Sequence, residues 1–144
     1  MIYFSQRVSS EKSGDSFKRQ EETWRRAYAV AGSLRERFPQ VDQVVVDMVF
    51  EDVKKAGTYS TQMRSFSASA KAFFAFPCPR TLCLDGGYDL DPLIVELLAA
   101  GDTNAMGTME CRGALGATRS ADARCLLRMH YRIQIHYKVP VRRN

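Results

Sequence analysis

Four cysteines are the residues of this 144-residue chain whose type and spacing most clearly favour a specific chemistry. They form two pairs in the sequence, Cys78 with Cys83 and Cys111 with Cys125, which enclose four and thirteen residues. Four thiolates arranged as a tetrahedron are a ligand set that zinc prefers. We therefore expect all four cysteines to bind one structural Zn²⁺, with a spacing looser than the two-residue pairs of zinc knuckles.

The beginning of the chain bears on the redox state of these thiols. The first seven residues, MIYFSQR, lack the long apolar stretch of a secretory signal. No apolar run approaches the roughly 20 residues needed to span a bilayer. We therefore expect a cytoplasmic protein with no membrane partner. Thiols stay reduced in that compartment, which favours metal binding over disulfides.

Arginines close to the cysteines support the metal site. Arg112 and Arg124 directly flank two of the cysteines, and Arg80 follows Cys78 by two residues. Positive groups would offset the excess negative charge of four thiolates and lower their pKa. The alternatives are buried unligated cysteines, an iron–sulfur cluster, a redox thiol pair and a catalytic cysteine.

The C-terminal third of the chain is strongly basic, within a net charge of +5 for the whole. Residues 111–144 carry eight basic side chains and one acidic, whereas residues 81–110 carry six acidic and none basic. We predict that the polar face of the last strand and the tail form a row of Arg128, His130, Arg132, His136, Lys138, Arg142 and Arg143. Such a row favours a nucleic-acid, ribonucleoprotein or acidic protein partner, with a merely solvated face as the alternative.

Catalytic patterns are weak. Asp89 and Asp91 are explained by the start of a helix, and Asp52-Val53-Lys54 matches only a short fragment of some metal-dependent nucleases. The sequence has no phosphate-binding glycine loop, nucleophile elbow or dinucleotide fingerprint. His130 and His136 are predicted to point away from the core and to lie roughly 20 Å apart, too far to share a metal ion.

The elements that would position these residues begin with a helix. Residues 1–15 are polar and aperiodic, which predicts a flexible arm. From Asp15 or Ser16, either of which can cap, a helix should run to about Phe38, before Pro39. Its apolar face comprises Phe17, Trp24, Tyr28, Ala31, Leu34 and Phe38.

Strands follow. Residues 41–51 read as a central strand with both faces partly apolar, and strict alternation over 127–139 predicts a long antiparallel strand with one face on the core. We also predict strands at 70–77 and 106–111, a loop or weak edge strand at 58–69, and a short helix at 91–101 that starts at Asp91-Pro92.

Together these features predict an α+β protein. We expect an arm at 1–15 and a single domain at 16–144. That domain would have one antiparallel sheet of four to five strands, packed by the long N-terminal helix and a second short helix, with the four-cysteine site at one end. The expected function is a small non-enzymatic, zinc-stabilised binding protein that uses the basic sheet face. A protein-interaction or assembly module with structural zinc and a metal-dependent enzyme are the alternatives.

Overall fold

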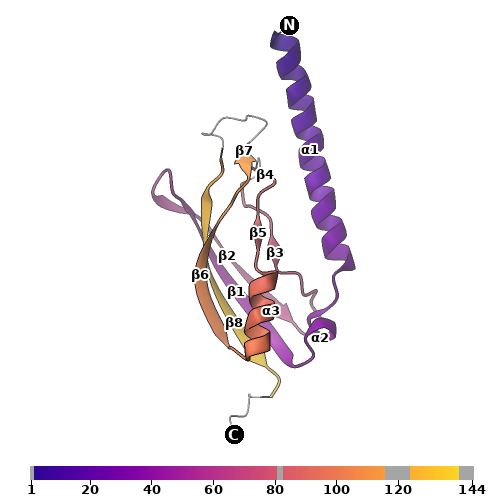
Figure 1. Cartoon of the computed structure of the whole chain (residues 1–144), viewed down its shortest axis with the longest axis vertical. Coiled ribbons are helices and arrows are strands. Elements are labelled where there is room, and N and C mark those ends of the chain that lie inside the picture. Colours follow the sequence, from indigo (N-terminus) through magenta and orange to yellow (C-terminus); the bar gives the residue numbers. More distant parts are fainter. Residues whose placement is uncertain (1, 81–82, 116–123, 140–144) are drawn as a thin grey trace.

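The computed structural model describes the backbone of residues 2–80, 83–115 and 124–139, with side chains from residue 16 onward (Figure 1). It is a mixed α+β arrangement around one four-stranded antiparallel sheet, which confirms the coarse prediction. In spatial order the strands are β2 (Gly57–Ser67), β1 (Val41–Asp52), β8 (Leu127–Tyr137) and β6 (Asn104–Glu110). None of the described helices is long and apolar enough to cross a membrane.

The core lies on one face of this sheet because β1 and β8 alternate in side-chain polarity. On β1, Val44, Val46, Met48 and Phe50 are buried. The matching residues of β8 are buried in the same layer, namely Leu127, Met129, Ile133 and Ile135. The 58–69 segment, left open between loop and strand, is the edge strand β2. We call the covered side the inner face and the opposite side the outer face.

Residues 70–77, predicted as a full strand, instead cross the inner face. Only β3 (Ala75–Phe76) is a strand, and it pairs with β5 (Tyr88–Asp89) outside the main sheet. The reason is packing: Phe74 is buried with its ring 5.0 Å from that of Phe66, so the aromatic side chains cover the sheet rather than extend it. A second small pair comprises β4 (Cys83–Leu84) and β7 (Ala114–Leu115).

The short helix α3 (Asp91–Ala100) matches its prediction and helps to cover the inner face. Ile94, Leu97 and Leu98 are buried, and Gly101 ends the helix in the left-handed conformation, with φ 71°. One detail differs. Asp91 is a helical residue rather than the cap, and its amide donates to the Asp89 carboxylate at 3.0 Å.

The N-terminal helix departs most from the sequence prediction. Helix α1 spans Ile2–Val30, so it begins inside the segment predicted as an arm and ends well before Phe38. It also stands beside the body rather than on the inner face, and its first turns extend beyond the rest of the chain (Figure 1). None of the side chains from Ser16 to Val30 is buried.

Local hydrogen bonding explains why the helix stops early. Ser33 begins a separate helix, α2 (Leu34–Arg37), by a capping box in which its hydroxyl accepts the Glu36 amide and Glu36 accepts the Ser33 amide. Beside it, the Gly32 carbonyl accepts the Ala72 amide at 2.8 Å instead of continuing the helix. The apolar spacing across residues 31–38 reflects the burial of Leu34 in α2, not one continuous helix.

Candidate metal centre

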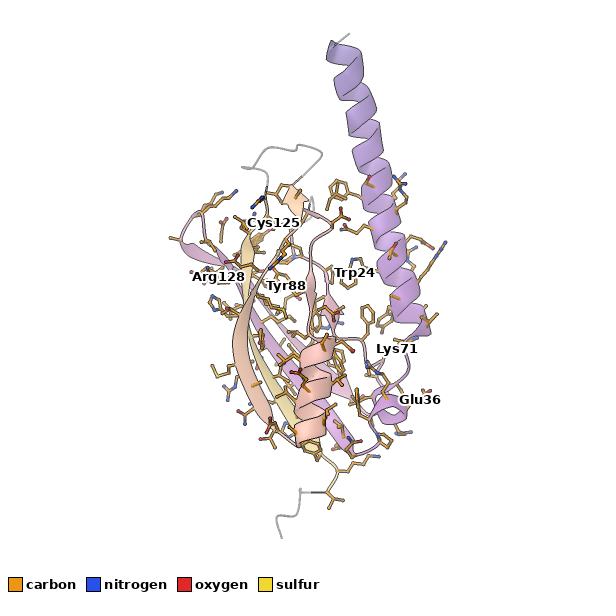
Figure 2. The ribbon with its side chains drawn as sticks, in the orientation of Figure 1. Trp24, Glu36, Lys71, Tyr88, Cys125 and Arg128 are labelled. Atoms are coloured by element: carbon orange, nitrogen blue, oxygen red, sulfur yellow. The ribbon has the colours of Figure 1, made fainter. Side chains whose placement is uncertain are left out.

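The four cysteines meet at one end of the sheet because each lies next to the end of a strand. Cys111 follows β6 and Cys125 precedes β8, and these strands are neighbours. Cys83 opens β4, which pairs with β7 just beyond Cys111. Cys78 comes two residues after β3. Figure 2 shows this end of the molecule, with Cys125 and Tyr88 labelled.

The sulfur atoms are close enough to hold one metal ion. All four Sγ atoms lie within 4.8 Å of one another, and the Cys78–Cys125 and Cys83–Cys111 separations are both 3.5 Å. A tetrahedron with metal–sulfur bonds of about 2.3 Å has edges of about 3.8 Å, which this cluster matches. A disulfide would need about 2.05 Å, and all four cysteines are free thiols.

Backbone amides point at the sulfurs. Backbone hydrogen bonds from Arg80, Gly113 and Leu127, each two residues after a cysteine, favour the thiolate forms of Cys78, Cys111 and Cys125 respectively. The Gly87 amide also donates to Cys111 Sγ at 3.4 Å. Donors of this kind stabilise thiolate ligands and hold them in position.

Two glycines make room for the cluster. A Cβ atom added to Gly113 would overlap Cys83 Sγ, and one added to Gly86 would overlap the sulfurs of Cys83 and Cys111. The two glycine backbones also lie against each other. No other residue type fits at these positions without displacing a sulfur atom.

Each thiol affects the ionisation of the others. The pKa values of Cys83 and Cys78 are raised, mainly by hydrogen bonding with Cys111. The pKa of Cys111 is lowered, mainly by hydrogen bonding with Cys125. Burial adds to the rise for Cys83. Four adjacent thiols therefore cannot all ionise by themselves, and a cation between them is the group that would make them equivalent.

Of the three arginines expected near the sulfurs, Arg80 is bound into the site. Its guanidinium donates to the Cys125 carbonyl at 3.1 Å and pairs with Asp52 at 2.8 Å, and both side chains are largely buried. Arg112 and Arg124 are exposed. Asp52, the acid of the nuclease-like fragment, is therefore the partner of a structural arginine.

Sequence reasoning missed two side chains that contact the centre's loops. Gln20 of α1 donates to the Cys83 carbonyl at 3.0 Å and accepts the Asp85 amide at 2.6 Å. Tyr88 donates to the Leu127 carbonyl at 2.7 Å, and burial, with the adjacent cysteines, raises its pKa. Nothing local in the sequence marked either side chain as a neighbour of the cysteines.

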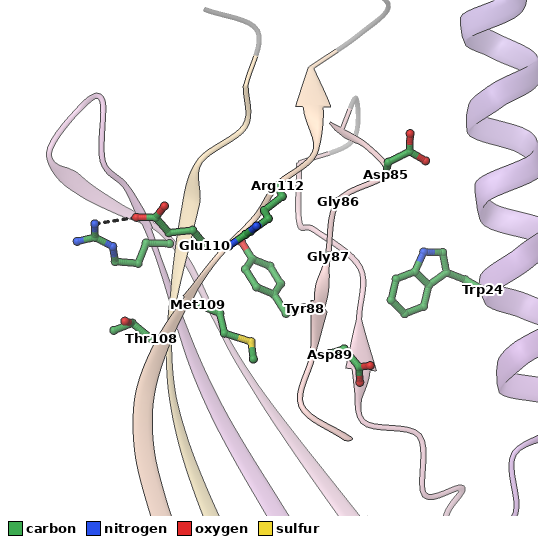
Figure 3. Close-up of a pocket in the computed structure, with 11 residues that line it drawn as sticks. Trp24, Asp85, Gly86, Gly87, Tyr88, Asp89, Thr108, Met109, Glu110 and Arg112 are labelled. Atoms are coloured by element: carbon green, nitrogen blue, oxygen red, sulfur yellow. Dashed lines mark hydrogen bonds and ion pairs between the residues drawn. The ribbon is translucent and has the colours of Figure 1, made fainter. Parts of the chain in front are cut away.

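A cleft of about 830 Å³ adjoins the centre between α1 and β6 (Figure 3). Trp24 forms one wall, Gly86 and Gly87 lie across from it, and the side chain of Tyr88 points away from Trp24, toward the side of Thr108 and Met109. Within the described residues the four cysteines form the only cluster of three or more potential metal ligands. The cleft therefore lies beside the centre and has no ligand set of its own.

The basic row lies on the uncovered outer face, but acidic side chains from neighbouring strands accompany it. Arg128 pairs with Glu110 at 3.0 Å and approaches Glu51 at 3.9 Å, while His130 lies 2.9 Å from Glu51. Arg132 stands opposite Asp47 in the sheet register. Two further residues of the basic row, His136 and Lys138, are exposed. Arg142 and Arg143 lie outside the described residues.

Comparison with family models, curated proteins and solved structures found no match to this chain.

Proposed function

We propose that this protein is a non-enzymatic binding module whose strand ends are fastened by a structural zinc ion. The observation that carries the proposal is the closed set of four sulfurs within 4.8 Å, supported by backbone amides. Four protein ligands fill the tetrahedral coordination of zinc and leave no position for a substrate or water. A metal-dependent enzyme would need such an open position, so this arrangement favours a structural role.

Zinc is favoured over iron by the size and setting of the site. Tetrahedral sulfur sites hold zinc or iron. A multi-iron cluster needs wider separations between some of its cysteine sulfurs than these, because the four sulfurs are divided among two or more iron atoms. Zinc also suits a reducing compartment such as the cytoplasm, where we place the protein.

Metal analysis tests this step directly. Protein purified without chelator should contain about one zinc per chain and little iron, and its four thiols should resist a thiol reagent until a chelator is added. If the protein contains iron instead of zinc, the identity of the metal is wrong but the four-cysteine site stands. If the fully reduced protein binds no metal after zinc is added, the proposal of a structural metal site is wrong.

The outer face of the sheet is the surface proposed for a partner. Met63 on β2 and Met106 on β6 are exposed at 66% and 76%, at the two edges of a row that runs through Asp47 and Arg132. Opposite charges alternate from strand to strand beside these apolar side chains. A protein surface with its own mixed charges fits this pattern better than a uniformly negative polymer.

A nucleic-acid partner remains the second candidate, favoured by the exposed His136 and Lys138 and by the basic sequence. Two sets of variants separate the candidates. For a protein partner, capture should survive nuclease treatment and be lost in Met63→Glu/Met106→Glu with zinc retained. For nucleic acid, retention on a polyanion should fall steeply with salt, vanish in Arg128→Glu/Arg132→Glu/Lys138→Glu and increase in Glu51→Gln/Glu110→Gln.

A further inference from the structure

Helix α1 is attached to the body at two places of different kinds. The first is near its C-terminal end, where Lys71 Nζ donates to the Ala29 carbonyl at 2.6 Å and its ammonium lies over the Tyr28 ring. Tyr28 also packs edge-on against Phe73. These contacts involve the chain that crosses the inner face, away from the cysteines.

The second attachment is to the loop that carries a metal ligand. The Gln20 amide bridges the Cys83 carbonyl and the Asp85 amide, at 3.0 and 2.6 Å. One turn later Trp24 lies against Gly87, where an added Cβ would stand 3.1 Å from its Cζ2 atom. Among the strands and helices, α1 has its most extensive contact with β4, which contains Cys83.

The shape of this loop depends on the sulfur cluster. Asp85 has a positive φ of 57°, which costs energy in a residue other than glycine, and Gly87 has φ 122°. The loop is held in this form by the Gly87 amide on Cys111 Sγ and by Cys83 Sγ itself. Besides the sulfurs, the two-residue β4–β7 pair holds the Cys83–Leu84 backbone, and β7 itself begins three residues after the ligand Cys111. Separation of the ligands would therefore loosen the spacing of the Cys83 carbonyl and the Asp85 amide that Gln20 bridges.

The contact is also thin. Clefts of about 830 and 510 Å³ lie on either side of it, and Trp24, Asp85 and Gly86 line both. Trp24 is only half-buried. Apart from the edge-on contact of its ring with Phe73, at a centroid separation of 5.9 Å, little apolar burial holds this half of the helix.

We infer that metal occupancy of the four-cysteine site controls the docking of α1 through Gln20 and Trp24. With metal bound, the Cys83–Gly87 loop offers the two groups that Gln20 bridges. When the metal leaves, the half of α1 that contains Gln20 and Trp24 separates from the body. The helix then pivots at its remaining attachment, where Lys71 donates to the Ala29 carbonyl. This inference rests on the proposed metal site, and it makes α1 a conformational reporter of metal binding.

Linkage makes the inference measurable from both sides. If the metal favours docking, docking must strengthen metal binding by the same free energy. The two Gln20 hydrogen bonds are worth roughly fivefold each, so Gln20→Ala should weaken zinc binding, measured in competition with a chelator, roughly 25-fold. Glu21→Gln is the matched control, because Glu21 is exposed and, among the described side chains, pairs only with Arg25 of the same helix.

Trp24 supplies the second readout, since it is the only tryptophan of the chain. Its emission, excited where tyrosine does not absorb, should move to longer wavelength and become more easily quenched by acrylamide when zinc is removed. Zinc addition should restore it. The Gln20→Ala variant should show the shifted emission with zinc still bound, whereas Glu21→Gln should match the wild type.

The results separate this inference from the metal assignment. If Gln20→Ala binds zinc stoichiometrically, with the Trp24 emission and the zinc affinity of the wild type, the metal does not control the docking of α1. The metal assignment itself is then unaffected. A chain that binds no metal overturns both. The zinc-bound Gln20→Ala variant keeps the test decisive even if zinc removal unfolds the whole protein.

Discussion

Helices α1 and α3 are held to the same body by different forces. Helix α3 has ten residues and buries Ile94, Leu97 and Leu98 against the inner face. Helix α1 has 29 residues, and none of its described side chains is buried. The position of α3 follows from apolar burial, whereas that of α1 depends on a glutamine, a tryptophan and a lysine. Length therefore says little about how firmly a helix is held.

The comparison extends to the two parts of the body. Beneath α3, aliphatic and aromatic side chains fill the space between helix and sheet. At the opposite end, where α1 docks, glycines and sulfur atoms take their place. A metal ion would contribute there the stability that packing contributes under α3.

The largest effect is expected from breaking the metal end. Cys111→Ser should abolish zinc binding and lower the free energy of unfolding by about 4 kcal/mol or more. Chemical denaturation and metal analysis measure both effects. Cys78→Ser is the informative partner, because Cys78 is less buried than Cys111. If both cysteines are metal ligands, both variants should lose zinc to the same extent. If Cys78→Ser keeps its zinc and its stability, the cysteines act only as buried side chains.

A cavity under α3 should weaken the other end without affecting the metal. Ile94→Ala removes a fully buried side chain and should cost about 3 kcal/mol of unfolding free energy. Zinc content and Trp24 emission should remain as in the wild type. Val95→Ala is the control, since Val95 is 40% exposed and should be nearly neutral. Loss of zinc in Ile94→Ala would show that the two ends are not separable.

Tyr88 connects the two regions, because its ring is buried in the core and its hydroxyl reaches the strand beside Cys125. Tyr88→Phe removes the 2.7 Å hydrogen bond to the Leu127 carbonyl and should cost about 1.5 kcal/mol. Tyr137→Phe is the matched control, since its bond to the Asp102 carbonyl is exposed to solvent. An equal cost in thermal unfolding for both would contradict a special role for Tyr88.

The smallest effect concerns the junction between α1 and the body. Ser33→Ala removes the capping box of α2 and should cost about 1 kcal/mol. Hydrogen bonding to Ser33 lowers the pKa of Glu36 below its ordinary 4.5. The stabilisation that ionised Glu36 contributes is therefore fully present above pH 4.5, and it is lost as the pH falls through the lowered pKa of Glu36. Denaturation across that range should show the acid-side loss in the wild type and not in the variant.

Local patterns predicted what local physics determines. The alternation along 127–139 gave the face of β8, and the positions of the cysteines next to strand ends were enough to predict that four distant sulfurs meet. Pro92 and Gly101 marked α3. The residues that determine β8 and α3 lie within a few positions of one another, and each cysteine lies within two residues of a strand end.

Two of the three failures originate in contacts between distant segments. The pairing of Arg128 with Glu110 depends on the register of β6 against β8, which the sequence of one strand does not contain. The path of residues 70–77 depends on what Phe74 meets across the sheet. Helix α1 was misjudged because apolar spacing through residue 38 hid the short capping box at Ser33.

The strand order has a consequence for synthesis. Strand β1 sits between β2, its immediate successor, and β8, the last of the described strands. A ribosome therefore releases the β1–β2 hairpin long before the strand that completes its other edge, and Cys125 emerges with that later segment. The sheet cannot close around β1 until residues 127–137 have been synthesised, so its hairpin must wait for a partner that lies far along the sequence.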